Sequence, residues 1–284
     1  MMALRPVDDL LEVRRPASGS ARLAFCRSGS KTVLATAFAT NPLRVLAPRN
    51  HGEAAWVFLS NLGGGLVDGD RLDVDVDVQE GAAALIGTQA STKVYRSPRG
   101  CSQHLRGHVG DEAALAVVPD PVVCFAGAHY EQDTRIQLSP SGSVLIVDGY
   151  TSGRSARGER WEFDLYASRT SIERGGAPVF IDATRLDPAV GSIAQRLGRF
   201  DVVLSVLAIG PRFASVRRTM LESFEALGPP KRGGSVIAAA SPIGHDGALA
   251  RVAADRFEKG SRALHASFAA LADVLGDNPF VRKW

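Results

Sequence analysis

The segment from Arg71 to Val78 constrains the fold more than any other part of the chain. Its sequence, RLDVDVDV, alternates aliphatic and acidic residues, which is the period of a β-strand with one buried and one solvated face. Further short apolar segments follow at intervals of about ten residues, separated by turn residues. This spacing favours an all-β sandwich, barrel or solenoid over an α/β fold, although no strict repeat period indicates a regular solenoid.

The β-rich pattern gives way to a mixed pattern near residue 187. Before that point we expect strands at Ala83–Gly87, Leu115–Val118, Thr134–Leu138, Ser143–Val147, Glu162–Ala167, Thr170–Arg174 and Val179–Asp182. After it we expect strands at Asp201–Ile209 and Ser235–Ala240, and helices over Ala189–Leu197, Pro211–Leu227 and Ala248–Leu275. The predicted fold is mainly β, with many short strands in a β-helical or layered arrangement and two or more helices in the C-terminal third. We expect residues 1–20 to be a flexible N-terminus and residues 21–284 to form a single β-rich domain.

Composition excludes several classes of protein. Of the 284 residues, 45% are hydrophobic and 22% are charged, and the net charge is +3, which is too small to indicate a nucleic-acid partner. The longest apolar run, Val202–Ile209, is too short to span a bilayer, and the N-terminus has no apolar signal region. Cys26, Cys101 and Cys124 form no CxxC motif, which argues against a zinc ribbon or a disulfide framework. We therefore expect a cytoplasmic protein without a membrane or nucleic-acid partner.

A glycine-rich loop with two carboxylates precedes the alternating segment. It reads Leu62-Gly-Gly-Gly-Leu-Val-Asp-Gly-Asp70, and such a loop can approach a ligand closely through its backbone. A phosphate cradle would need a helix after the loop, whereas a strand follows here and the carboxylates would repel phosphate. Two interpretations remain: a strained turn with incidental aspartates, or a cation-handling site built from Asp68 and Asp70.

The other charged motifs also allow two interpretations each. Gly153–Glu159, with sequence GRSARGE, is either a solvated hairpin connection or an ion-pair site lining a polar passage, since arginine binds carboxylates bidentately. His129 and Glu131 alternate in a predicted strand and so share a face, where they could bind a metal with a third group or simply lie at the surface. His104 and His108 share a face but lie too far apart for joint ligation. No HExxH or GxSxG motif is present.

Four blocks, in this order, resemble the UreD/UreH family of urease accessory proteins. They are Asn41-Pro-Leu-Arg-Val45, Leu62-Gly-Gly-Gly-Leu-Val-Asp-Gly-Asp-Arg-Leu72, Gly87-Thr-Gln-Ala-Ser-Thr-Lys-Val-Tyr-Arg-Ser97, and Val118–Gln132 followed by Gly153–Glu159. Asn41 and Gly87 depart from the family's usual glycine and threonine. The ending Val281-Arg-Lys-Trp284 is similar to the family's C-terminal R-x-W. The resemblance covers residues 41–187 well.

The resemblance implies a largely β fold in which strands wind like a right-handed helix. It also implies a non-catalytic scaffold for urease maturation, through which Ni²⁺ passes transiently along a polar internal passage toward the apo-urease active site. No cofactor would be tightly bound. The partners would be a UreF-like accessory protein, a UreG-like GTPase bound through it, and apo-urease.

The motifs that resemble the family place this passage at four residues of this chain, with four supporting residues. The passage residues are Asp70, Thr88, Gln89 and Glu159, supported by Asp68, Lys93, Tyr95 and Arg154. Oxygen ligands suit transfer, because they hold Ni²⁺ more weakly than imidazole or thiolate does. Two other functions remain open: a β-rich hydrolase that uses Asp70 or Glu159 as acid or base, and a protein-interaction module without a metal.

Overall fold

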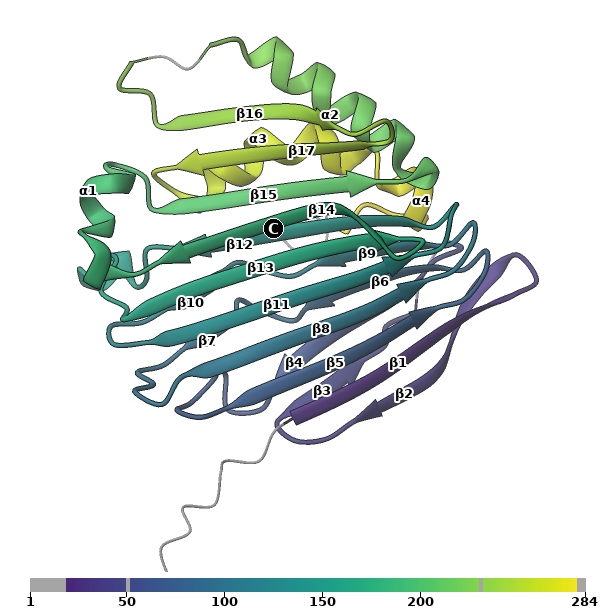
Figure 1. Ribbon diagram of the computed structural model, residues 1–284, viewed down its shortest axis with the longest axis horizontal. Coiled ribbons are helices and arrows are strands. Elements are labelled where there is room, and N and C mark those ends of the chain that lie inside the picture. The colour runs from purple at the N-terminus through teal and green to yellow at the C-terminus, as the bar shows by residue number, and fades with distance from the viewer. Residues whose placement is uncertain (1–18, 50–51, 230–231, 280–284) are drawn as a thin grey trace, which may run out of the picture.

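The computed structural model describes residues 19–49, 52–229 and 232–279. The N-terminal segment predicted to be flexible, residues 1–20, lies outside these ranges except for its last two residues, which begin the first strand. Two β-sheets face each other, and helices cover the outer face of one of them (Figure 1). The prediction of a mainly β protein in a β-helical or layered arrangement, with helices in its C-terminal third, is therefore confirmed.

The strands divide between the sheets as follows. Sheet A has the order β14 (Ala177–Leu186), β13 (Leu165–Arg174), β11 (His129–Leu138), β8 (Cys101–Val109), β5 (Arg71–Val78), β1 (Gly19–Ser28) and β2 (Lys31–Ala39). Sheet B has the order β16 (Val236–Ile243), β17 (Gly247–Ala254), β15 (Val202–Ile209), β12 (Ser143–Thr151), β9 (Ala114–Val118), β6 (Ala83–Thr88), β4 (Ala55–Asn61) and β3 (Leu43–Leu46). The short strands β7 (Lys93–Val94) and β10 (Val122–Cys124) pair with each other, and β10 also pairs with β12.

The middle of the chain winds between the two sheets. From β4 to β13 it passes alternately through sheet B and sheet A, and the successive strands within each sheet are parallel. Asp73 pairs with His104, His104 with Asp133, and Asp133 with Arg169. The turns of this coil thus take 29 to 36 residues, within the range of solenoid repeats. The repeat was not visible in the sequence, because equivalent positions carry chemically different side chains.

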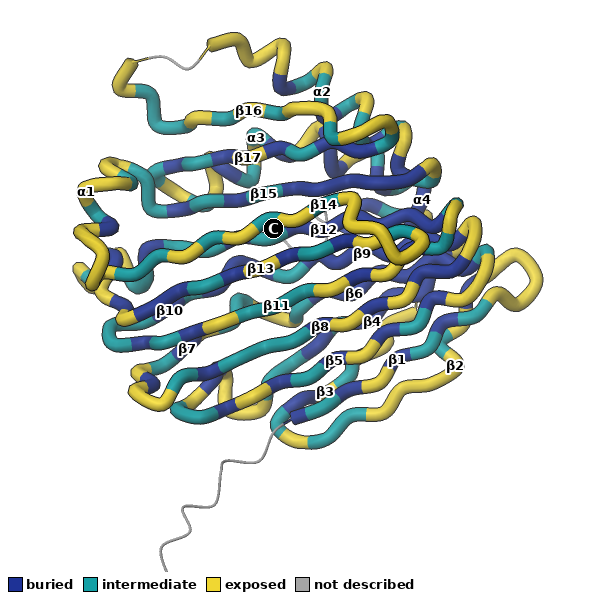
Figure 2. Tube along the Cα trace, in the orientation of Figure 1, coloured by how far each residue is buried: buried dark blue, intermediate teal, exposed yellow. Residues whose placement is uncertain are grey.

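The alternating residues of Arg71–Val78 point to opposite faces of β5, as predicted. Leu72, Val74, Val76 and Val78 are buried between the sheets, while the aspartates between them lie on the outer face of sheet A. Each apolar side chain on this inner face packs against the inner face of sheet B, so burial of the period-two pattern holds the two sheets together. Figure 2 shows this alternation along the strands of sheet A.

The C-terminal third differs from the prediction in one element. The segment Ala248–Leu275 was expected to be a single long helix, but Gly247–Ala254 forms β17, and helix α3 spans Phe257–Ala269. The reason is that alanine and valine at alternate positions from 248 to 254 also fit a strand, and all four of these side chains are buried on one face. Similarly, the two strands expected within 162–174 are one strand, β13.

Helices complete a second core on the outer face of sheet B. They are α2 (Ala214–Leu227), α3 and α4 (Ala272–Leu275), together with the short 3₁₀ turn η4 (Pro211–Phe213). Helix α1 (Ile193–Leu197) instead packs Ile193 into the core between the sheets, and the 3₁₀ turns η2 (Ser155–Arg157) and η3 (Pro188–Val190) bury no residue. Phe213, Met220 and Phe268 are fully or almost fully buried against sheet B. Among the described residues, no helix is both long enough and apolar enough to cross a membrane.

Candidate functional site

A cavity lined by both polar and apolar side chains opens between the two sheets. Its volume is about 220 Å³, enough for several water molecules. The glycine-rich loop and the segment 89–92 form its rim, and Thr88 and Gln103 lie on its inner side. The side chain of Asn61 keeps the rim in place: its Nδ2 donates a hydrogen bond to the Gly65 carbonyl at 3.0 Å.

A smaller cavity of about 50 Å³ continues inward from the first. The two cavities share Leu59, Thr88 and Gln103 in their walls. Polar side chains from five strands line the inner one: Thr88, Gln103, Gln132, Thr134, Asp148 and Thr170. They occupy inward-facing positions that aliphatic residues fill elsewhere on the same strands. A polar path therefore leads from the glycine-rich loop into the space between the sheets.

Asp148 is the carboxylate at the inner end of this path. Its Oδ1 accepts a hydrogen bond from Gln132 Nε2 at 2.8 Å, and its Oδ2 accepts one from Ser168 Oγ at 2.8 Å. Burial raises the pKa of Asp148 above its ordinary value, although these two hydrogen bonds oppose the shift. Tyr130 and Tyr166 are completely buried nearby, and burial raises the pKa of both phenols.

The structure brings two of the predicted passage residues, Thr88 and Gln89, to the cavity. Thr88 Oγ1 donates to Asp120 Oδ2 at 3.0 Å and accepts from the Asp120 backbone N–H at 2.8 Å. Thr88 thus holds the segment that follows β9 in place through Asp120, and its side chain also forms part of the cavity wall. Gln89 is exposed at the rim.

Asp70 lies outside the cavity and holds the glycine-rich loop. Its Oδ2 accepts a hydrogen bond from the Val67 N–H at 2.8 Å, and its own N–H donates to the Val67 carbonyl at 2.9 Å. Asp68 pairs with Arg99 at 2.7 Å, and this interaction lowers the pKa of Asp68. Gly63, Gly64 and Gly69 have positive φ. Both aspartates therefore have structural partners within or beside the turn.

Glu159 also lies away from the cavity, in a cluster with Arg154. Arg154 Nε donates to Glu159 Oε2 at 2.7 Å, and Nη2 contacts Oε1. The Arg154 guanidinium lies 4.2 Å from the centroid of the Phe125 ring, which meets the Tyr95 ring edge-on at 5.3 Å. The hydrogen bond from Arg154 lowers the pKa of Glu159. Lys93 is exposed on β7. The other predicted site residues lie in three separate places: at the cavity, in the glycine-rich loop, and in the cluster of Arg154 with Glu159.

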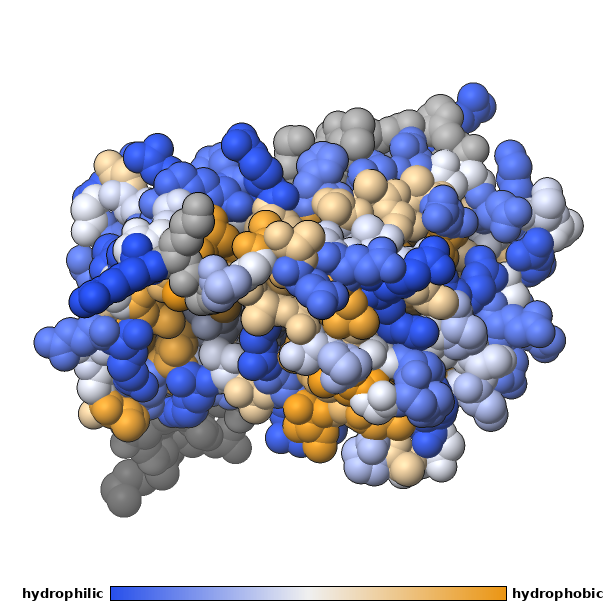
Figure 3. Space-filling view, turned by 90° about the horizontal axis from the view of Figure 1, so that it is seen from above, coloured by the Kyte–Doolittle hydropathy of each residue, from blue (hydrophilic) through white to orange (hydrophobic). Residues whose placement is uncertain are grey.

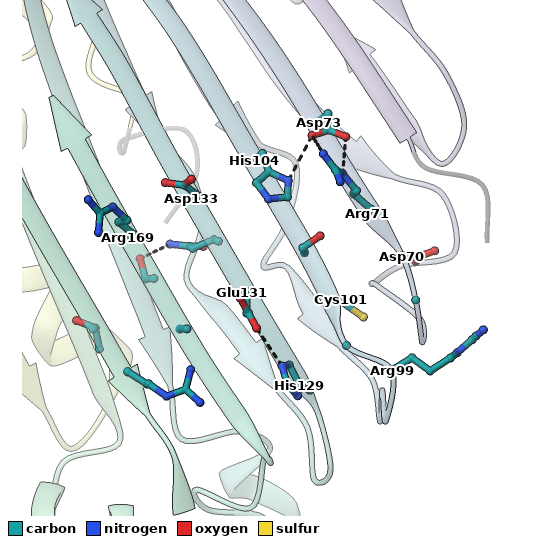
Figure 4. Close-up of a pocket in the computed structure, with 18 of the residues that line it drawn as sticks. Asp70, Arg71, Asp73, Arg99, Cys101, His104, His129, Glu131, Asp133 and Arg169 are labelled. Atoms are coloured by element: carbon teal, nitrogen blue, oxygen red, sulfur yellow. Dashed lines mark hydrogen bonds and ion pairs between the residues drawn. The ribbon is translucent and has the colours of Figure 1, made fainter. Parts of the chain in front are cut away.

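A second, more open groove crosses the outer face of sheet A and has a volume of about 1040 Å³. In Figure 4, Asp73, His104, Asp133 and Arg169 lie in a row across four strands. His104 Nδ1 is 3.3 Å from Asp73, and His129 Nε2 is 3.1 Å from Glu131. His129 and Glu131 share a face as predicted, but within the described part of the chain no three His, Cys, Asp or Glu side chains are arranged to hold a metal ion.

Sequence reasoning missed most of the cavity wall. Gln103, Gln132, Thr134, Asp148 and Thr170 were not proposed as site residues. A signal for Asp148 was present, because extending the predicted strand Ser143–Val147 by one residue places Asp148 on the same face as the buried Val144 and Ile146. A carboxylate at an inward-facing strand position is unusual in a core and indicates a special role.

Comparisons with known proteins agree with the sequence blocks. Residues 17–284 match the family model described as UreD urease accessory protein. The urease accessory protein UreD of Sorangium cellulosum (strain So ce56) is 51% identical over 267 residues, covering 94% of this chain and 85% of the relative. The urease accessory protein UreD of Anaeromyxobacter sp. (strain Fw109-5) is 40% identical over 292 residues, covering 98% and 97%. Urease accessory protein D of Oryza sativa subsp. indica is 34% identical over 293 residues, covering 93% and 95%. The chain therefore belongs to the UreD family of urease accessory proteins.

Proposed function

We propose that this protein is a non-catalytic scaffold in urease maturation and that Ni²⁺ crosses it through the cavity between the sheets on the way to apo-urease. A UreF-like accessory protein, with a UreG-like GTPase bound through it, would supply the metal in the cytoplasm. Family membership supports the role in urease maturation. The observation that supports a passage is the half-buried carboxylate of Asp148, which lines the inner of two adjoining cavities whose walls carry further polar side chains.

The chemistry of the cavity wall suits transfer of a cation. Its polar groups are the hydroxyls of Thr88, Thr134 and Thr170, the side-chain amides of Gln103 and Gln132, and the carboxylate of Asp148. Hydroxyl, amide and carboxylate oxygens bind Ni²⁺ more weakly than imidazole or thiolate does. One carboxylate also balances only part of a double positive charge, so an entering Ni²⁺ would be released readily.

The experiment compares the same substitution inside and outside the cavity. Gln103→Leu removes an amide from the cavity wall at similar size, and Gln137→Leu makes this change on the exposed face of the neighbouring strand β11. With apo-urease, the accessory partners and Ni²⁺, we expect urease activation to fall several-fold for Gln103→Leu and to stay unchanged for Gln137→Leu. Equal activation by both variants, at equal folded concentration, would rule out this cavity as the route.

The hydrolase alternative is less well supported by the geometry. The Asp70 carboxylate closes a turn and the Glu159 carboxylate is held by Arg154. A general acid near neutral pH needs a raised pKa, whereas Arg154 lowers the pKa of Glu159. Turnover of an ester or amide by the purified protein, lost in Glu159→Gln, would nevertheless favour the enzyme.

A further inference from the structure

Strand β14 forms a free edge of sheet A. It pairs with β13 and ends the sheet, so among the described strands it has a partner on one side only. None of its ten residues is buried, in contrast to β5, β8 and β11, which each bury several side chains. An exposed edge strand of this length presents a row of backbone N–H and C=O groups that another strand can pair with.

The side chains of β14 favour such pairing. On its outer face Val179 is 38% exposed and Ile181 is 54% exposed, and both are residues with high β-propensity. Strand β2 is a further long edge, at the opposite end of sheet A. Proline, which lacks the N–H that a pairing strand requires, interrupts both β16, at Pro242, and β14, at Pro178 near its start, so β14 is open to pairing from Val179 onward. Figure 3 looks onto the side of the molecule where β14 and β16 lie and shows hydrophobic surface among hydrophilic side chains.

Arg169 places a positive charge beside this edge, which favours a partner strand that carries a negative charge. It is exposed on β13, directly opposite Ala183 of β14 and Asp133 of β11. Asp133 is already paired with Arg135 at 2.6 Å, and no carboxylate of the described residues lies within ion-pair distance of Arg169. The small side chain of Ala183 leaves the space between Arg169 and the free edge open.

We infer that the β14 edge docks an extended segment of a protein partner, in which an aspartate or glutamate facing Arg169 is followed along the strand by aliphatic residues facing Ile181 and Val179. A strand added to β14 would lie about 10 Å from β13, two strand spacings away, which the side chains of arginine and an acidic residue span together. Strand addition supplies affinity through backbone hydrogen bonds, and side chains such as Arg169 supply specificity. This site is distinct from the proposed nickel route and does not depend on it.

Three blocked nonapeptides of alternating valine and threonine, with Asp, Asn or Lys at the centre, test this inference with the whole protein. We expect fluorescence anisotropy to show about tenfold tighter binding of the Asp peptide than of the Asn peptide, equivalent to about 1.4 kcal/mol. Bound Asp peptide should slow amide hydrogen exchange in residues 177–186. Arg169→Glu should reverse the preference so that the Lys peptide binds best.

The matched control is Arg22→Glu. It makes the same change on the same outer face of sheet A, but on β1, toward the opposite end of the sheet from β14. It should leave peptide binding unchanged. The inference is overturned if the three peptides bind alike, if none binds, or if exchange slows elsewhere instead. It is also overturned if light scattering shows a stable dimer whose formation protects residues 177–186, because the edge then belongs to a second copy of this chain.

Discussion

Gln132 on β11 and Asp148 on β12 join the two facing sheets through a hydrogen bond of 2.8 Å inside the cavity. Ser168 on β13 donates to the same carboxylate and accepts from Gln132 at 2.9 Å. Three strands from two sheets thus converge on one half-buried acid. Burial raises the pKa of Asp148. The stability of the folded protein therefore depends on pH through this group, and in our proposal the entry of the cation does so too.

Asp148→Asn should show this coupling in the stability of the protein. The folded-state pKa of Asp148 lies above its ordinary value of 3.8. The contribution of Asp148 to the free energy of unfolding is therefore fully present below pH 3.8 and is lost as pH rises through the folded-state pKa. Asparagine does not titrate, so we expect the variant to gain stability relative to the native protein over the range in which pH rises from 3.8 through the folded-state pKa of Asp148. Thermal unfolding across this range measures the difference, and a variant that loses relative stability as pH rises would contradict the prediction.

The same variant should also activate urease poorly. Asparagine retains the shape of the side chain but cannot carry the negative charge that, in our proposal, attracts Ni²⁺ into the cavity. We expect activation in the reconstituted mixture to fall several-fold. Asp77→Asn, on the outer face of β5, should keep normal activation. Normal activation by folded Asp148→Asn would show that the carboxylate is structural.

Glu159→Ala should have little effect on folding and a larger effect on activation. The Arg154–Glu159 pair is partly exposed, with side-chain exposures of 34% and 16%, and such pairs stabilise a protein by at most about 1 kcal/mol. Loss of Glu159 nevertheless frees Arg154 from its position over Phe125, which should disturb the surface of this loop. Melting temperature and activation per folded molecule separate the two effects. A large drop in melting temperature with normal activation would make Glu159 purely structural.

The sequence predicted the fold class better than the site. Alternation in Arg71–Val78 identified buried and solvated faces correctly, because burial of every second side chain is a local property of a strand. The cavity instead depends on which strands become neighbours: Gln103 and Gln132 are one turn of the coil apart, and Asp148 lies on the next strand in the facing sheet, so the three meet only after winding. Motif resemblance therefore found Thr88 in the cavity wall and Gln89 at the rim but grouped them with Asp70 and Glu159, which lie elsewhere.

The glycine-rich loop should tolerate substitution unequally. A Cβ on Gly65 would lie 2.7 Å from both the Lys93 carbonyl oxygen and Tyr95 Cε2, whereas a Cβ on Gly64 would meet nothing within 4 Å. Gly64 has a φ of +72°, which asparagine tolerates better than alanine does. We expect Gly65→Ala and Gly65→Asn both to cost about 1–3 kcal/mol through overpacking, and Gly64→Asn to be milder than Gly64→Ala. Urea unfolding of the four variants checks this, and equal costs for the Asn variants would contradict it.

The exposed edge of β14 should make the isolated protein prone to aggregation. The phenylalanines of the C-terminal helices are not the cause, because Phe213, Phe224 and Phe268 are buried against sheet B. We expect Ile181→Lys to reduce turbidity on prolonged incubation, because a charged side chain on an edge strand opposes the addition of further strands. As an exposed substitution it should change the free energy of unfolding by no more than about 0.5 kcal/mol.

The matched variant for this prediction is Val190→Lys. Val190 is 76% exposed, more than Ile181, but it lies in the 3₁₀ turn η3 and not on a strand edge. If exposed apolar area alone drives aggregation, Val190→Lys should reduce turbidity at least as much as Ile181→Lys does. If strand pairing at β14 drives it, only Ile181→Lys should have a large effect, and fibrillar or sheet-rich aggregates of the native protein should be correspondingly depleted. Equal effects of the two variants would locate the cause outside β14.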